Sequence, residues 1–165
     1  MSYLNEGPVR VLFVCLGNIC RSPMAEAVFA QKVADAGLSD KIIVDSAGTG
    51  DWHVGEHAHS GTRRLLAEKG IPYSGRARHF TKSDLGKFDY VLTMDDDNLR
   101  TVRRHGIGTA MVRPFLEFAP QLGLTEVPDP YYTGNFAETY QLVDAAADGL
   151  LEQIRKDLSL RLDLD

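Results

Sequence analysis

The sequence predicts an α/β protein with a parallel β-sheet whose two faces are covered by helices. Short apolar segments rich in β-branched residues alternate along the chain with longer segments of helical spacing. The first apolar segment is continuous, which is typical of a strand buried on both faces of a sheet. The composition agrees with a globular domain, because 44% of the 165 residues are hydrophobic and 25% are charged.

A strand, a tight loop and a helix form the clearest unit, near the N-terminus. Residues Val9–Cys15 are the continuous apolar run, and Gly17 interrupts it. Ser22 and Pro23 are helix-start residues, and helical spacing follows them to about Ala36. Ligands bind beyond the carboxyl ends of the strands in such folds, so the loop between this strand and helix is a candidate site.

The remaining elements continue the alternation. Three further strands are predicted over Lys41–Ser46, Tyr90–Met94 and Ala110–Val112. Three further helices are predicted over Thr62–Lys69, Asp95–Arg104 and Asn135 to about Leu158. Between the last strand and the last helix, Glu117–Gly134 is rich in proline and tyrosine and predicts an irregular loop.

We expect a single domain spanning residues 1–165, since domains usually take about 100–200 residues. Residues 1–8 are expected to be flexible. The last residues, Leu158–Asp165, alternate between apolar and polar. That pattern fits an edge strand, a self-association segment or a frayed, flexible end over residues 159–165.

Charge and composition exclude several classes of protein. The formal net charge of −5 argues against a general nucleic-acid binder. The longest apolar run, Val11–Leu16, is far shorter than the roughly 20 residues of a membrane span, and the first residues do not resemble a secretory signal. Two cysteines cannot form a four-thiolate metal site, and His53, His57 and His59 lack a helical frame for metal binding. We expect a cytoplasmic protein without a metal, nucleic-acid or membrane site.

The loop from Cys15 to Ser22 has the features of an anion site built around a thiolate. A tight loop that leads into a helix can direct several backbone N–H groups at one anion. Gly17 and Asn18 tolerate the left-handed backbone that such a curl requires. Arg21 offers a planar fork for two phosphate oxygens. A thiol near a helix N-terminus and a cation ionises readily, so we expect Cys15 to be a thiolate that accepts a hydrogen bond from Ser22.

A bare match to Cys-x5-Arg is weak, because it occurs often by chance. The alternative is a buried core thiol at Cys15 and a surface charge at Arg21. The full context is more specific, because an apolar strand precedes the cysteine and Arg-Ser-Pro opens a helix. The loop is not a nucleotide-binding Walker loop, since no Gly-Lys-Ser/Thr follows the glycine.

Three segments resemble motifs of the low-molecular-weight protein tyrosine phosphatases, in the expected order. They are Val14–Pro23, Asp45–Thr49 and Val127–Tyr131. The resemblance covers about residues 9–157. It implies a flavodoxin-like fold with a four-stranded parallel sheet in the order 2-1-3-4. It also implies cofactor-free hydrolysis of phosphotyrosine or aryl phosphate monoesters through a phosphocysteine intermediate.

The resemblance assigns catalytic roles to Cys15, Arg21 and Asp129. In the family the aspartate protonates the leaving group and then activates water. Asp129 lies between Pro128 and Pro130, and the following proline restricts it to extended backbone. Without the resemblance, Asp-Pro is better explained as a turn dipeptide. The residues expected to bind substrate, with aromatic rings at the mouth, are Leu16, Gly17, Asn18, Ile19, Cys20, Ser22, Trp52, Tyr131 and Tyr132.

The residues that support the loop depart from the family pattern. Asn18 and Ser46 resemble the pair that holds the curled backbone in the family. Many members carry a supporting histidine where this chain has Gly75, and His79 is shifted along the chain. Which residue of this chain supports Asn18 is therefore left open by the sequence.

Two interpretations remain open for Cys20. In the family this cysteine forms a reversible disulfide with the nucleophile that protects it from over-oxidation, and a curled loop allows the required Cα separation. The alternative is an inert packed thiol.

Other functions remain as alternatives. An arsenate reductase of the same fold relays electrons through additional cysteines, which this chain lacks. Phosphoarginine phosphatases tend to carry threonine where this chain has Ile19. A phosphopeptide-binding module needs Arg21 but not both Cys15 and Asp129. We expect a phosphotyrosine protein or a small aryl phosphate as the substrate, and a monomer or weak homodimer.

Overall fold

The computed structural model describes residues 7–164, with side chains to residue 160. Four parallel strands form one sheet in the predicted order, β2-β1-β3-β4. The strands are β1 (Val9–Cys15), β2 (Ile42–Gly48), β3 (Tyr90–Thr93) and β4 (Met111–Pro114). The expected flexibility of residues 1–6 and of residue 165 concerns positions outside the described range.

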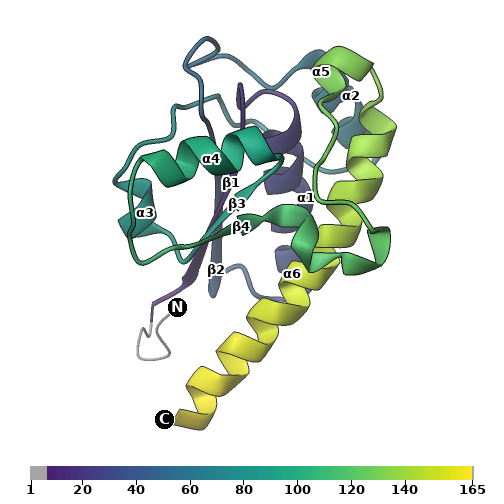
Figure 1. Cartoon of the computed structure of the whole chain (residues 1–165). Helices are drawn as coiled ribbons and strands as arrows, with labels where there is room; N and C mark the ends of the chain where they lie inside the picture. The colour runs from purple at the N-terminus through teal and green to yellow at the C-terminus, as the bar shows by residue number, and fades with distance from the viewer. Residues whose placement is uncertain (1–6, 165) are drawn as a thin grey trace.

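Helices cover both faces of the sheet, as predicted (Figure 1). The α-helices are α1 (Arg21–Asp35), α2 (Ser60–Glu68), α3 (Asp84–Lys87), α4 (Asp96–Arg104), α5 (Pro130–Thr133) and α6 (Phe136–Leu164). Two short 3-10 helices are η1 (Phe115–Phe118) and η2 (Pro120–Leu122). The expected irregular loop therefore contains η2 and α5, whose single turns are too short to show a helical period.

Strand β1 explains the continuous apolar run, because its two sets of side chains enter different cores. Val11 and Phe13 pack with α1 and α6 on one face. Leu12 and Val14 pack with α3 and α4 on the other face. The register pairs Cys15 with Gly48 of β2, so both strands end at the same edge of the sheet. The first strand therefore delivers Cys15 to the edge where parallel sheets bind ligands.

Helix α6 is longer than predicted and corrects the edge-strand interpretation of the tail. It continues through Leu164 and extends beyond the sheet (Figure 1). Leu150, Ile154 and Leu158 face the core at helical spacing, and neither glycine nor proline follows them. Helical spacing therefore prevails over the short alternating pattern. None of the described helices, α6 included, combines the length and hydropathy needed to cross a membrane.

Candidate active site

The loop after β1 curls tightly before α1 begins. Asn18 has a φ of 56°, and it is the one described residue other than glycine with positive φ, which confirms the expected left-handed position. The expectation of a left-handed backbone at Gly17 is wrong, because its φ is not positive. A Cβ at Gly17 would lie 3.0 Å from His53 Cδ2, so this glycine makes room for a neighbouring side chain.

A close backbone approach holds the curled loop against the end of β2. The amide of Thr49 donates to the Cys15 carbonyl at 2.9 Å, and the amide of Gly50 donates to the Leu16 carbonyl at 2.9 Å. A Cβ at Gly48 would lie 2.9 Å from the Leu16 carbonyl oxygen, which has no room to move. Gly48, in the motif Asp45–Thr49, therefore allows the loop to approach β2 this closely.

Two hydrogen bonds surround the sulfur of Cys15. Its Sγ lies 3.0 Å from Ser22 Oγ and accepts a hydrogen bond from the Asn18 amide at 3.3 Å. Only 2% of Cys15 is exposed, yet the residue lines an open cavity. The sulfur thus lies between two polar groups at the wall of the cavity, which is a suitable position for a nucleophile.

The guanidinium of Arg21 is buried and held along one edge. Its Nη1 donates to Asp95 Oδ2 at 2.8 Å and to the Val127 carbonyl at 2.9 Å. Its Nη2 reaches Asp129 Oδ2 only at 3.4 Å. Among the described residues, Nε has no hydrogen-bond partner although it is fully buried. A buried donor without a partner is costly in a folded protein, and Nε with Nη2 forms the fork that binds two oxygens of a phosphate.

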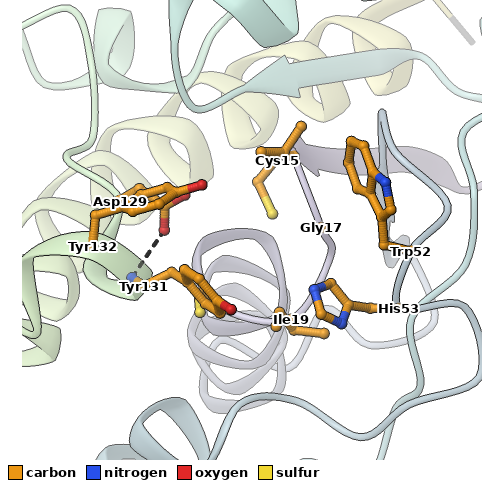
Figure 2. Close-up of a pocket in the computed structure, with 10 residues that line it drawn as sticks. Cys15, Gly17, Ile19, Trp52, His53, Asp129, Tyr131 and Tyr132 are labelled. Carbon is orange, nitrogen blue, oxygen red and sulfur yellow. Dashed lines mark hydrogen bonds between the residues drawn. The ribbon is translucent and has the colours of Figure 1, made fainter.

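Asp129 faces the cavity from the start of α5. Its Oδ1 accepts a hydrogen bond from the Tyr131 amide at 3.1 Å, so the carboxylate caps α5. Figure 2 shows Cys15 between Asp129 and Tyr132 on one side and Trp52 and His53 on the other. An acid and a sulfur nucleophile thus face the same space.

The cavity has the size of a single side chain. Its volume is about 220 Å³, below the roughly 300–1,000 Å³ of sites for drug-sized ligands. The expected substrate-binding residues that line it are Leu16, Gly17, Ile19, Cys20, Trp52, Tyr131 and Tyr132. Trp52 and Tyr132 are 69% and 76% exposed, so their rings stand at the mouth. Asn18 and Ser22 are buried beneath the loop.

Asn18 holds the loop through a chain of hydrogen bonds. The amide of Arg78 donates to Asn18 Oδ1 at 2.9 Å, which orients the side-chain amide. Asn18 Nδ2 therefore donates to Ser22 Oγ at 2.8 Å and to Ser46 Oγ at 2.9 Å. Since both hydroxyls accept from Asn18, the proton of Ser22 is free for Cys15.

Glu26 and Tyr73 complete this chain where the family has a histidine. Ser46 Oγ donates to Glu26 Oε1 at 2.6 Å, and the Tyr73 hydroxyl donates to the same oxygen at 3.0 Å. The pKa of the Glu26 carboxyl is raised, because the effect of burial is larger than the lowering effect of the hydrogen bonds from Ser46 and Tyr73. His79 does not substitute, because its Nε2 lies 3.1 Å from the Thr49 carbonyl instead.

Replacing Tyr73 by phenylalanine tests this support. The variant leaves the half-buried Glu26 with one donor fewer, so we expect a loss of about 1–3 kcal/mol in the free energy of unfolding. We expect turnover of a small aryl phosphate to fall several-fold without being abolished, because Cys15 and Arg21 keep their own contacts. Urea unfolding and steady-state kinetics measure the two effects. Tyr140→Phe is the matched control, and equal effects in both variants would contradict a role for the Tyr73 hydroxyl.

The second thiol of the loop differs from the first in its surroundings. Burial, the largest cause, and the charges of Cys15 and Asp129 raise the pKa of Cys20 to about 12, against the opposing effect of Arg21. Cys20 is therefore a neutral thiol at physiological pH. Both cysteines are free in the structure, so the reversible disulfide stays a prediction.

Alkylation separates the two thiols, because iodoacetamide reacts with thiolates. The raised pKa keeps the proton on Cys20 as the pH rises, so we expect Cys20 to stay unlabelled up to about pH 9 while Cys15 is labelled. Both cysteines lie in the tryptic peptide 11–21, and fragmentation in a mass spectrometer locates the label. Inorganic phosphate should slow the labelling. Comparable labelling of Cys20 in this range contradicts the assignment.

Sequence reasoning missed three side chains that hold the site: Glu26, Tyr73 and Asp95. Glu26 lies one helical turn after Ser22, on the helix face next to β2. This spacing of four residues could have indicated that Glu26 lies on the same side of the helix as Ser22. Asp95 follows β3 at the same edge of the sheet, and it caps α4 while also binding Arg21. A helix starting at Asp95 was predicted, but the bond from Asp95 to Arg21 was not. Tyr73 had no signal, because its partner is 47 positions away in the chain.

The fold and the site together define a class: a parallel α/β protein in which a cysteine and an aspartate line one cavity and the aspartate contacts a buried arginine. Comparison with known families places the chain within this class. The family described as low molecular weight phosphotyrosine protein phosphatase matches residues 10–160. The chain belongs to this family.

Curated relatives agree over nearly the whole length. The chain is 45% identical over 155 residues to the low molecular weight protein-tyrosine-phosphatase YfkJ of Bacillus subtilis, covering 92% of this chain and 99% of that protein. It is 45% identical over 159 residues to a low molecular weight protein-tyrosine-phosphatase of Streptomyces coelicolor, covering 92% and 97% respectively.

Solved structures show the same fold. The crystal structure of YfkJ has a TM-score of 0.89 at 44% identity, covering 93% of this chain and 99% of that one. This agreement confirms the flavodoxin-like fold. A Drosophila arginine phosphatase has a TM-score of 0.82 at 30% identity, covering 87% and 96%. The fold alone therefore does not distinguish an aryl phosphate from a phosphoarginine substrate.

Proposed function

We propose that the protein hydrolyses phosphotyrosine and other aryl phosphate monoesters through a phosphocysteine at Cys15. The observation that carries this proposal is the buried Nε of Arg21, which no described residue satisfies. The Nη2 of the same side chain contacts Asp129, and Asp129 and Cys15 line the same cavity. A phosphoryl group bound in this cavity would satisfy Nε and meet a nucleophile.

In the first step, the Cys15 sulfur attacks phosphorus and the bond from phosphorus to the aryl oxygen breaks. The electron pair of that bond goes to the phenolic oxygen, which takes a proton from Asp129. Arg21 and the loop amides stabilise the charge on the equatorial oxygens. Leaving as phenol rather than phenolate matters, because phenolic groups have a pKa of about 10.

In the second step, a water molecule attacks the phosphocysteine on the side that the phenol has left. The water gives a proton to Asp129, which the first step has left ionised. The bond between sulfur and phosphorus breaks, and its electron pair returns to Cys15 as the thiolate. Inorganic phosphate leaves, and Asp129 again carries its proton.

Hydrolysis of phosphoarginine is the alternative function, because an arginine phosphatase shares the fold. Ile19 and three aromatic residues line the cavity, namely Trp52, Tyr131 and Tyr132. This apolar lining supports an aromatic ring rather than a charged guanidinium chain. An arsenate reductase is disfavoured, because the sequence has only the two loop cysteines.

One assay compares the candidates directly. We expect phosphotyrosine and phenyl phosphate to be hydrolysed with at least a tenfold advantage in kcat/KM over phosphoarginine. Inhibition by vanadate and insensitivity to chelators should accompany turnover. A preference for phosphoarginine would favour the alternative, and binding of phosphotyrosine without turnover would favour a phosphopeptide-binding module.

We further propose a cytoplasmic protein that acts as a monomer or weak homodimer without nucleic acid or membrane. The acidic net charge of −5 supports the absence of a nucleic-acid partner. Sedimentation over a range of concentrations tests the oligomeric state.

A further inference from the structure

A second groove adjoins the active-site cavity. It has a volume of about 650 Å³ and shares Ile19, His53 and Tyr131 with that cavity. Its remaining lining includes Arg63 of α2 and Arg76 from the loop before α3. We call it the basic groove.

The two arginines of the basic groove are oriented without being neutralised. Arg63 Nε donates to the Ala58 carbonyl at 2.9 Å, and Arg76 Nη1 donates to the Gly55 carbonyl at 2.9 Å. Carbonyls carry no net charge, so both guanidiniums keep theirs and have further N–H groups to donate. In the part of the chain that the structure describes, the arginines that form ion pairs are Arg21, Arg78, Arg100 and Arg113.

The backbone around the basic groove is fixed. An antiparallel bridge joins His57 to Arg76, and the amide of Gly55 donates to the Ala77 carbonyl at 2.9 Å. The amide of Ala77 donates in turn to the Glu56 carbonyl at 2.9 Å. The two segments that carry the groove are therefore joined on the side of Arg76.

The remaining polar groups leave the groove positive. Glu56 is its one acidic lining residue, and its carboxylate contacts His53 Nδ1 at 2.8 Å. Two guanidiniums therefore stand against a single carboxylate. His59 Nδ1 accepts from the Gly61 amide at 3.0 Å, so a neutral His59 ring carries its proton on Nε2. This local charge contrasts with the net charge of −5 for the whole chain.

We propose that the basic groove binds acidic side chains next to the phosphotyrosine of a substrate protein. The inference rests on the proposed function. A phosphotyrosine side chain in the cavity brings its peptide backbone to the mouth beside Tyr131, where the basic groove begins. Carboxylates of neighbouring substrate residues then meet Arg63 and Arg76, whose forks match carboxylate geometry. The preferred substrates are acidic phosphotyrosine segments.

Peptide kinetics test this proposal. One phosphotyrosine peptide carries three glutamates before the phosphotyrosine, and a second peptide carries three glutamates after it. Each peptide has a counterpart in which glutamines replace the glutamates. We expect one acidic peptide to exceed its counterpart in kcat/KM by about two- to tenfold at low salt, the range of a few exposed ion pairs. Raising the ionic strength should reduce this ratio. The double variant Arg63→Gln/Arg76→Gln should bring it to about one.

The control variant is Arg103→Gln/Arg104→Gln, since these exposed arginines lie on α4 away from the groove. It should keep the ratio of the unmodified protein. A ratio of one for both peptide pairs in the unmodified protein overturns the proposal, whatever the folding of the variants. So does a ratio that survives the Arg63/Arg76 substitutions. Phenyl phosphate separates this failure from a wider one, because its lack of turnover would contradict the proposed function itself.

Discussion

Replacing Cys15 by serine should abolish turnover of aryl phosphates, with a fall in kcat of at least about 10⁴-fold. A serine hydroxyl is far less nucleophilic than a thiolate. Ser22 and Asn18 direct donors at position 15, so the site stabilises an anion that serine does not form. Stopped-flow assays with p-nitrophenyl phosphate measure the loss.

The fold should survive this change, because serine nearly matches cysteine in shape. We expect the variant to bind inorganic phosphate, since Arg21 and the loop amides are unchanged. A phosphate-dependent rise in melting temperature in both proteins is the control. Substantial turnover by the serine variant would show that the reaction bypasses Cys15.

Asp129→Asn should lower kcat by about 10²–10⁴-fold, the usual contribution of a positioned acid. Asparagine keeps the size of the side chain and can still accept the hydrogen bond from the Tyr131 amide. The substitution therefore removes the transferable proton while leaving the cap of α5. The limb of the pH–rate profile that reports the acid should disappear.

The leaving group provides an internal control for this variant. The phenyl leaving group depends strongly on receiving a proton, whereas the p-nitrophenyl leaving group depends on it less, because p-nitrophenol is more acidic. The loss of rate should therefore be larger for phenyl phosphate than for p-nitrophenyl phosphate. Equal losses together with an unchanged pH–rate profile would show that Asp129 is not the acid.

Much of the site was predictable because it is local in the chain. Strand β1 is recognisable from its continuous apolar run, which two buried faces require. Asn18 was expected to be left-handed from its residue type alone, and its φ of 56° agrees. The order of the strands was available only from the family resemblance, because hydrophobic periodicity does not specify which strands pair.

The parts that were not predictable depend on contacts between distant segments. The bond from Arg21 to Asp95 spans 74 positions, and nothing at either position predicts it. Gly17 was expected to allow a left-handed backbone, but the close approach of the His53 side chain gives a better reason for a glycine at this position. The tail of α6 alternates like a strand, yet the helix continues through it to Leu164, and Leu158 packs against the core.

A search for the phosphoryl group on the sulfur tests the proposed mechanism at its centre. Asp129→Asn should also slow the attack of water, so a phosphorylated enzyme should accumulate when p-nitrophenyl phosphate is added and the reaction is stopped in denaturant. We expect up to one phosphoryl group per chain, located by mass spectrometry on Cys15 within the peptide 11–21. A phosphoryl group on any other residue, or its absence while turnover continues, would contradict the mechanism.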